Sequence, residues 1–137
     1  MSKHALKRKA MDNQQAHTYL MAKPHTTVSQ PFGEGVDVYK VKDKMFATLA
    51  LGKMGKSNET PTHWWMNLKC DPDEAHILRD IFDSVIPGYH MNKRLWNTII
   101  LDGSIPQGEI ERMIDNSFKL VVQKMPKKAQ TSILLQM

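Results

Sequence analysis

Short apolar runs separated by polar turns fill residues 26–69, a pattern typical of β-strands. These runs predict four strands, at Thr26–Ser29, Val36–Val41, Met45–Leu51 and His63–Lys69. The turn at Lys42–Lys44 is short enough to join the second and third strands as a hairpin. A fifth strand is predicted at Trp96–Leu101. Because the first four strands follow one another without a helix between them, an antiparallel sheet is expected.

Helical spacing of apolar residues appears on both sides of these strands. Asp12 and Gln15 form a capping-box pattern that begins a helix over about 13–22. Asp71, followed by a proline and two acids, begins a second helix that we expect to end at Pro87–Gly88. The apolar stripe of this second helix comprises Ala75, Leu78, Ile81, Phe82 and Val85.

A last long helix is predicted after the fifth strand. Ser104 and Gln107 form a second capping-box pattern, and the helix runs to about Lys124. Its apolar face comprises Ile110, Met113, Ile114, Phe118 and Val121. The predicted order is therefore α-β-β-β-β-α-β-α, an α+β fold in which helices pack on one face of an antiparallel sheet.

Charge is distributed unevenly along the 137 residues, although the formal net charge is +5. Basic residues concentrate in three segments, 1–12, 40–56 and 119–137, and the rest of the chain is acidic. We interpret 1–11 as a basic N-terminal extension, 12–125 as a single domain and 126–137 as a basic C-terminal extension. No apolar run is long enough to span a membrane, and the N-terminus lacks a signal-peptide pattern. A cytoplasmic protein is expected, without membrane partners.

Local motifs for catalysis or metal binding are weak. Cys70 is the one cysteine, which excludes an internal disulfide and multi-thiolate zinc sites. It precedes a helix cap, so a reactive thiol is an alternative to a buried one. The Gly52–Ser57 string resembles a phosphate-binding loop, but Ala50 occupies the position of the required first glycine. Six histidines show no metal-ligand spacing. We expect no enzyme, no metal and no cofactor.

The segment Pro87–Asn97 is the densest in polar chemistry. It holds a turn, a histidine, two amides, two adjacent cations and two aromatic residues. Lys93 and Arg94 are suited to bind an anion, with hydrogen bonds from neighbouring amides. The same residues are also suited to form a polar network that fixes the crossing from helix to strand. Both interpretations stay open.

This segment and its continuation to Pro106 resemble the signature of the MmcQ/YjbR family of small bacterial proteins. Further agreement lies at Ala22–Pro24, Val41–Ala47, Ile114–Phe118 and Lys124–Pro126. The resemblance covers about residues 12–135. It implies a CyaY-like α+β fold, related in shape to frataxin, and a predicted double-wing DNA-binding protein.

Two hypotheses follow for function. The first is a non-enzymatic, monomeric protein that binds DNA mainly through phosphate contacts from basic hairpins. Its contact residues are Lys40, Lys42, Lys53, Lys56, Lys93 and Arg94. The alternative is a module that binds a protein partner or a small anionic ligand at Pro87–Asn97. The residues of that alternative site are His90, Asn92, Arg94 and Trp96.

Overall fold

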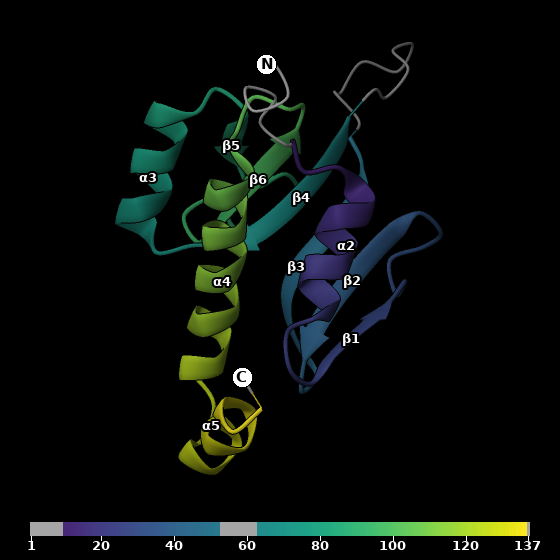
Figure 1. Ribbon diagram of the computed structural model, residues 1–137. Coiled ribbons are helices and arrows are strands. Elements are labelled where there is room, and N and C mark those ends of the chain that lie inside the picture. Colours follow the sequence, from purple (N-terminus) through teal and green to yellow (C-terminus); the bar gives the residue numbers. More distant parts are fainter. Residues whose placement is uncertain (1–9, 53–62, 137) are drawn as a thin grey trace, which may run out of the picture.

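The computed structural model describes residues 10–52 and 63–136 as one antiparallel sheet covered by helices. The strands are β1 (Thr26–Ser29), β2 (Val36–Val41), β3 (Lys44–Leu51), β4 (Trp64–Lys69), β5 (Val85–Pro87) and β6 (Trp96–Leu101). The described helices are α2 (Asn13–Met21), α3 (Pro72–Ile81), α4 (Gln107–Gln123) and α5 (Lys127–Leu134). The sheet has the order β1-β2-β3-β4-β6-β5 (Figure 1). The predicted α+β class is confirmed.

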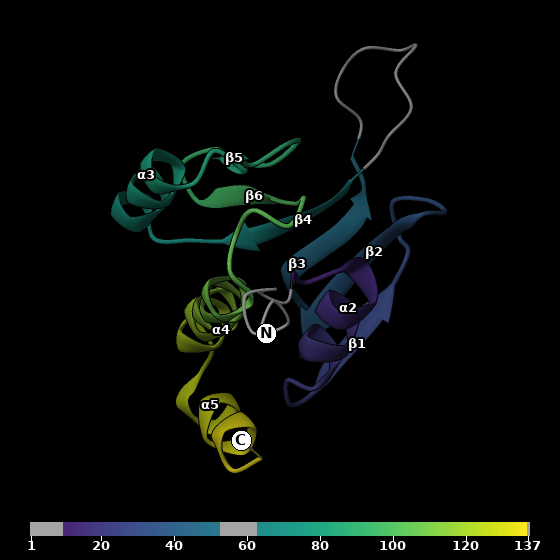
Figure 2. The same cartoon turned by 45° about the horizontal axis from the view of Figure 1, so that its top comes forward.

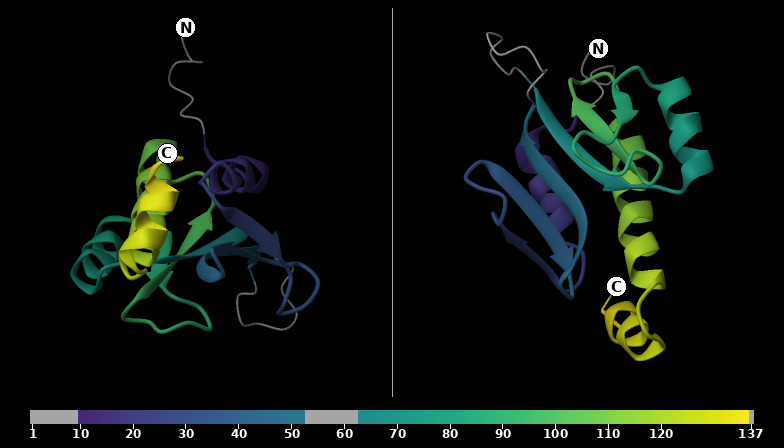
Figure 3. Two further views of the ribbon diagram at one scale, coloured as in Figure 1. Left: turned by 90° about the horizontal axis from the view of Figure 1, so that it is seen from below. Right: turned by 180° about the vertical axis from the view of Figure 1, so that it is seen from behind.

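The helices of residues 10–52 and 63–136 cover one face of this sheet and leave the other face without a helix. In Figure 2, α2 and α4 lie on the same side of the strands, while α3 lies beside β5. Seen from below, the loop between β5 and β6 extends on the opposite side (Figure 3). We call this second side the open face. No helix in the described part of the chain is long and apolar enough to cross a membrane.

The local signals of the sequence account for most element boundaries. The capping box at the start of α2 is present, with the Gln15 amide donating to Asp12 at 2.8 Å and the Asp12 amide donating to Gln15 at 3.0 Å. Asp71 caps α3 by accepting from the Glu74 amide at 3.2 Å. The predicted β1, β2 and β6 match the observed bounds, and β2 and β3 form the predicted hairpin.

Three features of the structure differ from the sequence prediction. Helix α3 ends at Ile81 rather than at Pro87, and Val85 begins the additional strand β5. Ser104 does not cap α4; the N-cap is Pro106, because the Ser104 hydroxyl instead donates to Asp102 at 2.6 Å. The helix α5 lies within 126–137, where no element was predicted.

The core lies between the sheet and α4, and a β-bulge shapes it. Tyr39 pairs with Ala47 and Lys40 with Met45, so Phe46 is the extra residue of β3. The Phe46 ring packs edge-to-face on Phe118 of α4, with centroids 5.2 Å apart. The strands β2 and β3 and the helix α4 therefore all contribute buried apolar side chains at this point. The largest fully buried side chains include Tyr39, Phe46, Leu49, Met66, Leu68, Ile99, Ile114 and Phe118.

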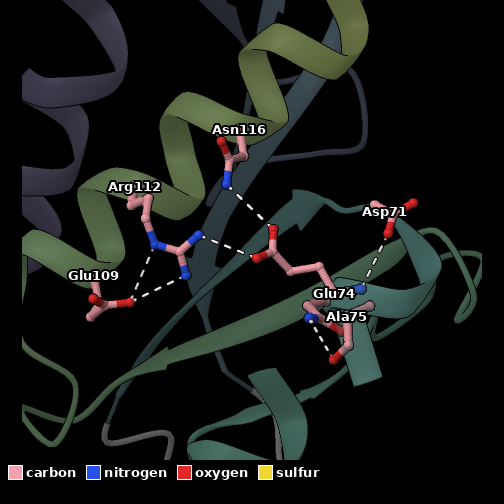
Figure 4. A network of polar contacts seen from close by, with 7 residues as sticks. Asp71, Glu74, Ala75, Glu109, Arg112 and Asn116 are labelled. Carbon is pink, nitrogen blue, oxygen red and sulfur yellow. Dashed lines mark hydrogen bonds and ion pairs between the residues drawn. The ribbon is translucent and has the colours of Figure 1, made fainter. Parts of the chain in front are cut away.

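Polar contacts join α3 to α4 at the surface (Figure 4). Glu74 of α3 accepts from Arg112 at 3.3 Å and from the Asn116 amide at 3.5 Å. Arg112 also pairs with Glu109 on its own helix at 3.2 Å. Because both ends of these ion pairs are about 40% exposed, they contribute little to stability. Both helices also contribute apolar side chains to the core, among them Leu78 of α3 and Met113 of α4.

Candidate functional site

The open face carries a groove of about 450 Å³. Alternation along the strands puts Thr48 and Asn67 on this face, and the two residues pair across β3 and β4. The groove is lined by Phe32, Val36, Thr48, Ala50, Leu51, Gly52, Trp65, Asn67, Tyr89, His90 and Met91. Its floor is formed by the middle strands of the sheet. Its rims are the β1–β2 turn and the β5–β6 loop, which flank the open face in Figure 3.

Aromatic side chains dominate the walls of the groove. The rings of Trp65 and Tyr89 meet edge-to-face with centroids 5.4 Å apart. Tyr89 also contacts His90, with centroids 4.0 Å apart. Phe32, on the opposite rim, is 66% exposed. The Trp65 indole lies so close to Gly52 that a Cβ at this glycine would be 2.2 Å from Nε1, so any larger residue would displace the indole.

Hydrogen bonds fix the aromatic rim to the floor. The Tyr89 amide donates to the Thr98 hydroxyl at 2.8 Å, and the Asn67 side-chain amide donates to the Tyr89 carbonyl at 3.3 Å. The Thr98 hydroxyl in turn donates to the Asn67 carbonyl oxygen. A Cβ at Gly88 would lie 2.8 Å from Cβ of Trp96, so only glycine allows the loop to start this close to β6. These contacts keep the rim formed without a ligand.

The remaining polar residues of the β5–β6 loop hold the loop itself. Asn92 accepts from the Arg94 amide at 2.9 Å and from the Leu95 amide at 3.3 Å. The Lys93 ammonium donates to the Gly88 carbonyl at 3.1 Å. Arg79 of α3 donates to the Lys93 carbonyl at 2.7 Å. In this part of the segment, the polar residues serve the helix-to-strand crossing.

The four residues of the predicted ligand site thus lie in different environments. His90 is exposed and lines the groove, with a positive φ of 60°. Asn92 is used by the loop backbone, and Arg94 is exposed near the end of the loop. Trp96 is 8% exposed and packs against Gly88. Of the four, His90 is the one that the structure brings to the groove.

The predicted phosphate contacts lie in two described regions. Lys40 is half-buried on the open face of β2, and Lys42 is exposed in the hairpin turn, 3.5 Å from the Ser132 hydroxyl of α5. Lys93 and Arg94 lie on the β5–β6 loop. Lys53 and Lys56 lie outside the described residues.

Cys70 belongs to the helix-covered side of the sheet. It is 8% exposed and packs in the core beside α3. Burial raises the pKa of its thiol from the ordinary 9.0 to about 11, and the charges of Glu74 and Asp71 act in the same direction. Burial and the raised pKa favour the buried alternative over a reactive Cys70, because the thiolate that reacts is suppressed near neutral pH.

Sequence reasoning did not find Phe32, Trp65 and Tyr89 as members of one site. The three come from a turn, a strand and a loop that only the folded sheet brings together. The signal that was available is the Trp64–Trp65 pair, whose members must face opposite sides of a strand. This expectation is confirmed, since Trp64 packs against the core while Trp65 lines the groove.

Together these features define a small α+β domain with an antiparallel sheet, helices on one face and an aromatic groove on the other. A family model described as YjbR matches residues 21–120. The chain belongs to the YjbR family.

Bacterial relatives match most of the chain. The uncharacterised protein YbdF of Escherichia coli O157:H7 is 30% identical over 127 residues, which cover 90% of this chain and 98% of that protein. The uncharacterised protein YjbR of Escherichia coli K12 is 32% identical over 110 residues, covering 80% and 86% respectively. The uncharacterised protein YyaQ of Bacillus subtilis is 44% identical over a shorter 55 residues, covering 40% and 46%.

Solved structures share the fold. A crystal structure of a Deinococcus radiodurans protein with a DUF419 domain superposes with a TM-score of 0.78 at 27% identity, covering 92% of this chain and 91% of that chain. A crystal structure of a Pseudomonas syringae protein gives a TM-score of 0.69 at 29% identity, covering 81% and 99%. The architecture described above is therefore one that experiment has found in similar proteins.

Proposed function

We propose that this protein is a binding module that takes a small, largely apolar ligand in the open-face groove. The observation that carries the proposal is a volume of about 450 Å³ walled by aromatic side chains. Cavities of about 300–1,000 Å³ with mainly apolar walls and a few polar groups are typical small-molecule sites. Thr48 and Asn67 supply the polar groups on the floor.

The rigidity of the rim supports binding with useful affinity. Tyr89 is held at both backbone polar groups, since its amide donates to Thr98 and its carbonyl accepts from Asn67. A wall that is already ordered loses little conformational entropy when a ligand binds. We infer that the groove accepts a ligand with small rearrangements.

The lining favours binding over catalysis. Among the described residues that line the groove, the titratable side chains are Tyr89 and His90. Neither is hydrogen-bonded to a nucleophilic side chain in the described part of the chain, as an activated nucleophile and base would be. We therefore assign no catalytic residue.

DNA binding through Lys40, Lys42, Lys93 and Arg94 is the competing hypothesis. The Lys93 ammonium already donates to the Gly88 carbonyl, and the open face between these cations is lined by apolar side chains. Phosphate contacts would make affinity fall steeply with salt. A groove that binds an apolar ligand would show little dependence on salt.

A neutral fluorescent probe, N-phenyl-1-naphthylamine, tests the proposal. Ala50 lies on the groove floor, so Ala50→Phe fills part of the groove without removing a wall. Thr27→Phe is the matched control, because Thr27 is exposed on the edge strand β1 and lies outside the groove. We expect the wild type and the control to bind the probe equally and Ala50→Phe to bind it at least about fivefold more weakly, the loss of roughly 1 kcal/mol of contact.

Equal probe affinity in all three proteins would contradict the groove as the site. Circular dichroism of each variant confirms that it is folded. Anisotropy of a labelled random duplex at about 50 and 200 mM salt tests the competing hypothesis in the same proteins. Salt-sensitive duplex binding that Lys40→Gln and Arg94→Gln weaken, together with no probe binding, would favour DNA as the ligand.

A further inference from the structure

Charge around the groove is one-sided. None of the described residues that line it is acidic. Lys40 follows Val38 by two positions on β2, so both side chains project from the open face of the sheet. Val38 pairs with the groove residue Thr48. Two residues of a strand span ~7 Å, a distance that a lysine side chain covers. The Lys40 ammonium is therefore within reach of the groove at its β2–β3 turn end.

The Lys40 side chain is available for a ligand. It is half-buried, and it makes no hydrogen bond or ion pair with residues 10–52 and 63–136. Other lysines nearby are engaged, since Lys42 approaches Ser132 and Lys93 donates to Gly88. A half-buried cation without a partner beside an apolar groove favours an anion over a neutral group.

We propose that the groove takes a planar aromatic acid whose ring lies against Trp65 and Tyr89 and whose carboxylate reaches Lys40. This inference rests on the proposed function and adds the class of ligand to it. Aromatic side chains prefer stacked or edge-to-face contacts with other rings, which a planar ligand provides. A volume of about 450 Å³ accommodates a ligand of two or three fused rings.

A single carboxylate fits this site better than a phosphate group. Phosphate recognition in proteins relies on several converging donors, such as an arginine fork or the amides at a helix start. The Lys40 ammonium is the one cation that we place within reach of the described groove, and the floor adds the Asn67 side-chain amide and the Thr48 hydroxyl as donors. One cation with these neutral donors matches one monovalent carboxylate.

A pair of probes that differ only in charge tests the inference. 2-Naphthoate and 2-naphthamide have the same ring and nearly the same shape, and each is titrated into the full chain and followed by NMR chemical shifts. We expect the acid to bind about three- to fivefold more tightly than the amide, the range of an accessible ion pair. Lys40→Met, which keeps most of the length of the side chain without its charge, removes this preference.

Lys44→Met is the matched control. Lys44 is exposed on the same hairpin and pairs with Val41, whose side chain lies in the core, so Lys44 belongs to the helix-covered face. The Lys44→Met variant removes the same charge from the protein but leaves the open face unchanged. We expect this variant to keep the preference for the acid.

Equal affinity for acid and amide, or a preference that persists in Lys40→Met, would overturn the inference. In that case the neutral probe would still bind and Ala50→Phe would still weaken it, so the proposed function would stand. Loss of binding of every probe would overturn both. The two failures are thereby distinguished.

Discussion

Ser117 is a buried hydroxyl at the point where β3 and β4 separate. The last pair of β3 and β4 is Ala47 with Leu68, and the bulged Phe46 has no partner on β4. The Ser117 hydroxyl of α4 lies between the strands, donating to the Phe46 carbonyl at 2.6 Å and accepting from the Lys69 amide at 2.9 Å. One side chain therefore satisfies two backbone groups that the bulge leaves without a ladder partner.

Replacing Ser117 by alanine is expected to lower the free energy of unfolding by about 2 kcal/mol. The physical reason is that a carbonyl and an amide stay buried without hydrogen-bond partners. Urea unfolding measures the change. Ser29→Ala is the control, since Ser29 is exposed on β1 and its replacement should stay within about 0.5 kcal/mol of the wild type. A loss below about 0.5 kcal/mol in Ser117→Ala would mean that the bulge finds other partners.

At the scale of elements, the β2–β3 hairpin turns through two residues with positive φ, Lys42 at 46° and Asp43 at 70°. These angles are typical of a type I′ turn, whose twist suits a two-residue hairpin. Lysine and aspartate adopt this left-handed region at a cost, whereas glycine adopts it freely. The hairpin forms because the flanking strands pair well, even though its turn is not optimal.

Asp43→Gly is expected to raise the melting temperature by about 2 to 4 °C, since it relieves the left-handed conformation at the second turn position. Thermal unfolding followed by circular dichroism measures the shift. The same replacement at Asp83 is the control: Asp83 is also exposed, but its φ is not positive, so glycine there only adds freedom to the unfolded chain. A lower melting temperature for Asp43→Gly would contradict the strain argument.

The elements also show how far the sequence determines the fold. Short runs rich in β-branched and aromatic residues predict β1, β2 and β6 at their observed bounds. The strand β5 was missed because Val85 continues the helical spacing of Leu78, Ile81 and Phe82, so periodicity alone extends α3. Its strand state depends on pairing with β6, as between Ile86 and Thr98, which no local pattern records.

For the candidate site, too, the sequence predicts what local patterns determine and misses what depends on tertiary contacts. His90 was found because the segment around it is chemically dense, and it lines the groove. Asn92 was read as a ligand residue, but its oxygen accepts backbone amides of the loop, and the sequence cannot tell these roles apart. Phe32 is far from both in sequence and contributes to the site only because β1 and β2 close the sheet on that side.

At the scale of the whole molecule, two buried acids, Cys70 and Tyr39, and the half-buried Tyr19 have raised pKa values, which make the stability fall at alkaline pH. Burial raises the pKa of Cys70 to about 11. Burial also raises the pKa of Tyr39 and of Tyr19 well above 10.0; the charge of Asp37 adds to the shift at Tyr39, and a hydrogen bond to Asp115 adds to it at Tyr19. The folded protein therefore keeps protons that the unfolded chain releases.

The free energy of unfolding is expected to be constant up to about pH 8 and to fall by on the order of 1 kcal/mol by pH 10, as the unfolded thiol and phenols lose protons first. Urea unfolding at pH 7, 8, 9 and 10 measures this slope. Cys70→Ala should flatten the part of the slope near pH 9, even if it lowers stability at neutral pH. A slope that is the same in both proteins would show that the thiol titrates alike in the folded and unfolded states.

The strand order has a consequence for the path by which the chain folds. β1, β2 and β3 pair as neighbours along the chain through short turns, so each pairing closes a small loop at low entropic cost. The pairing of β4 with β6 instead joins residues 64–69 to 96–101 across all of α3 and β5. Contacts of this separation form slowly. Substitutions that weaken the β4–β6 junction, such as Thr98→Ala, should therefore slow refolding in stopped-flow experiments.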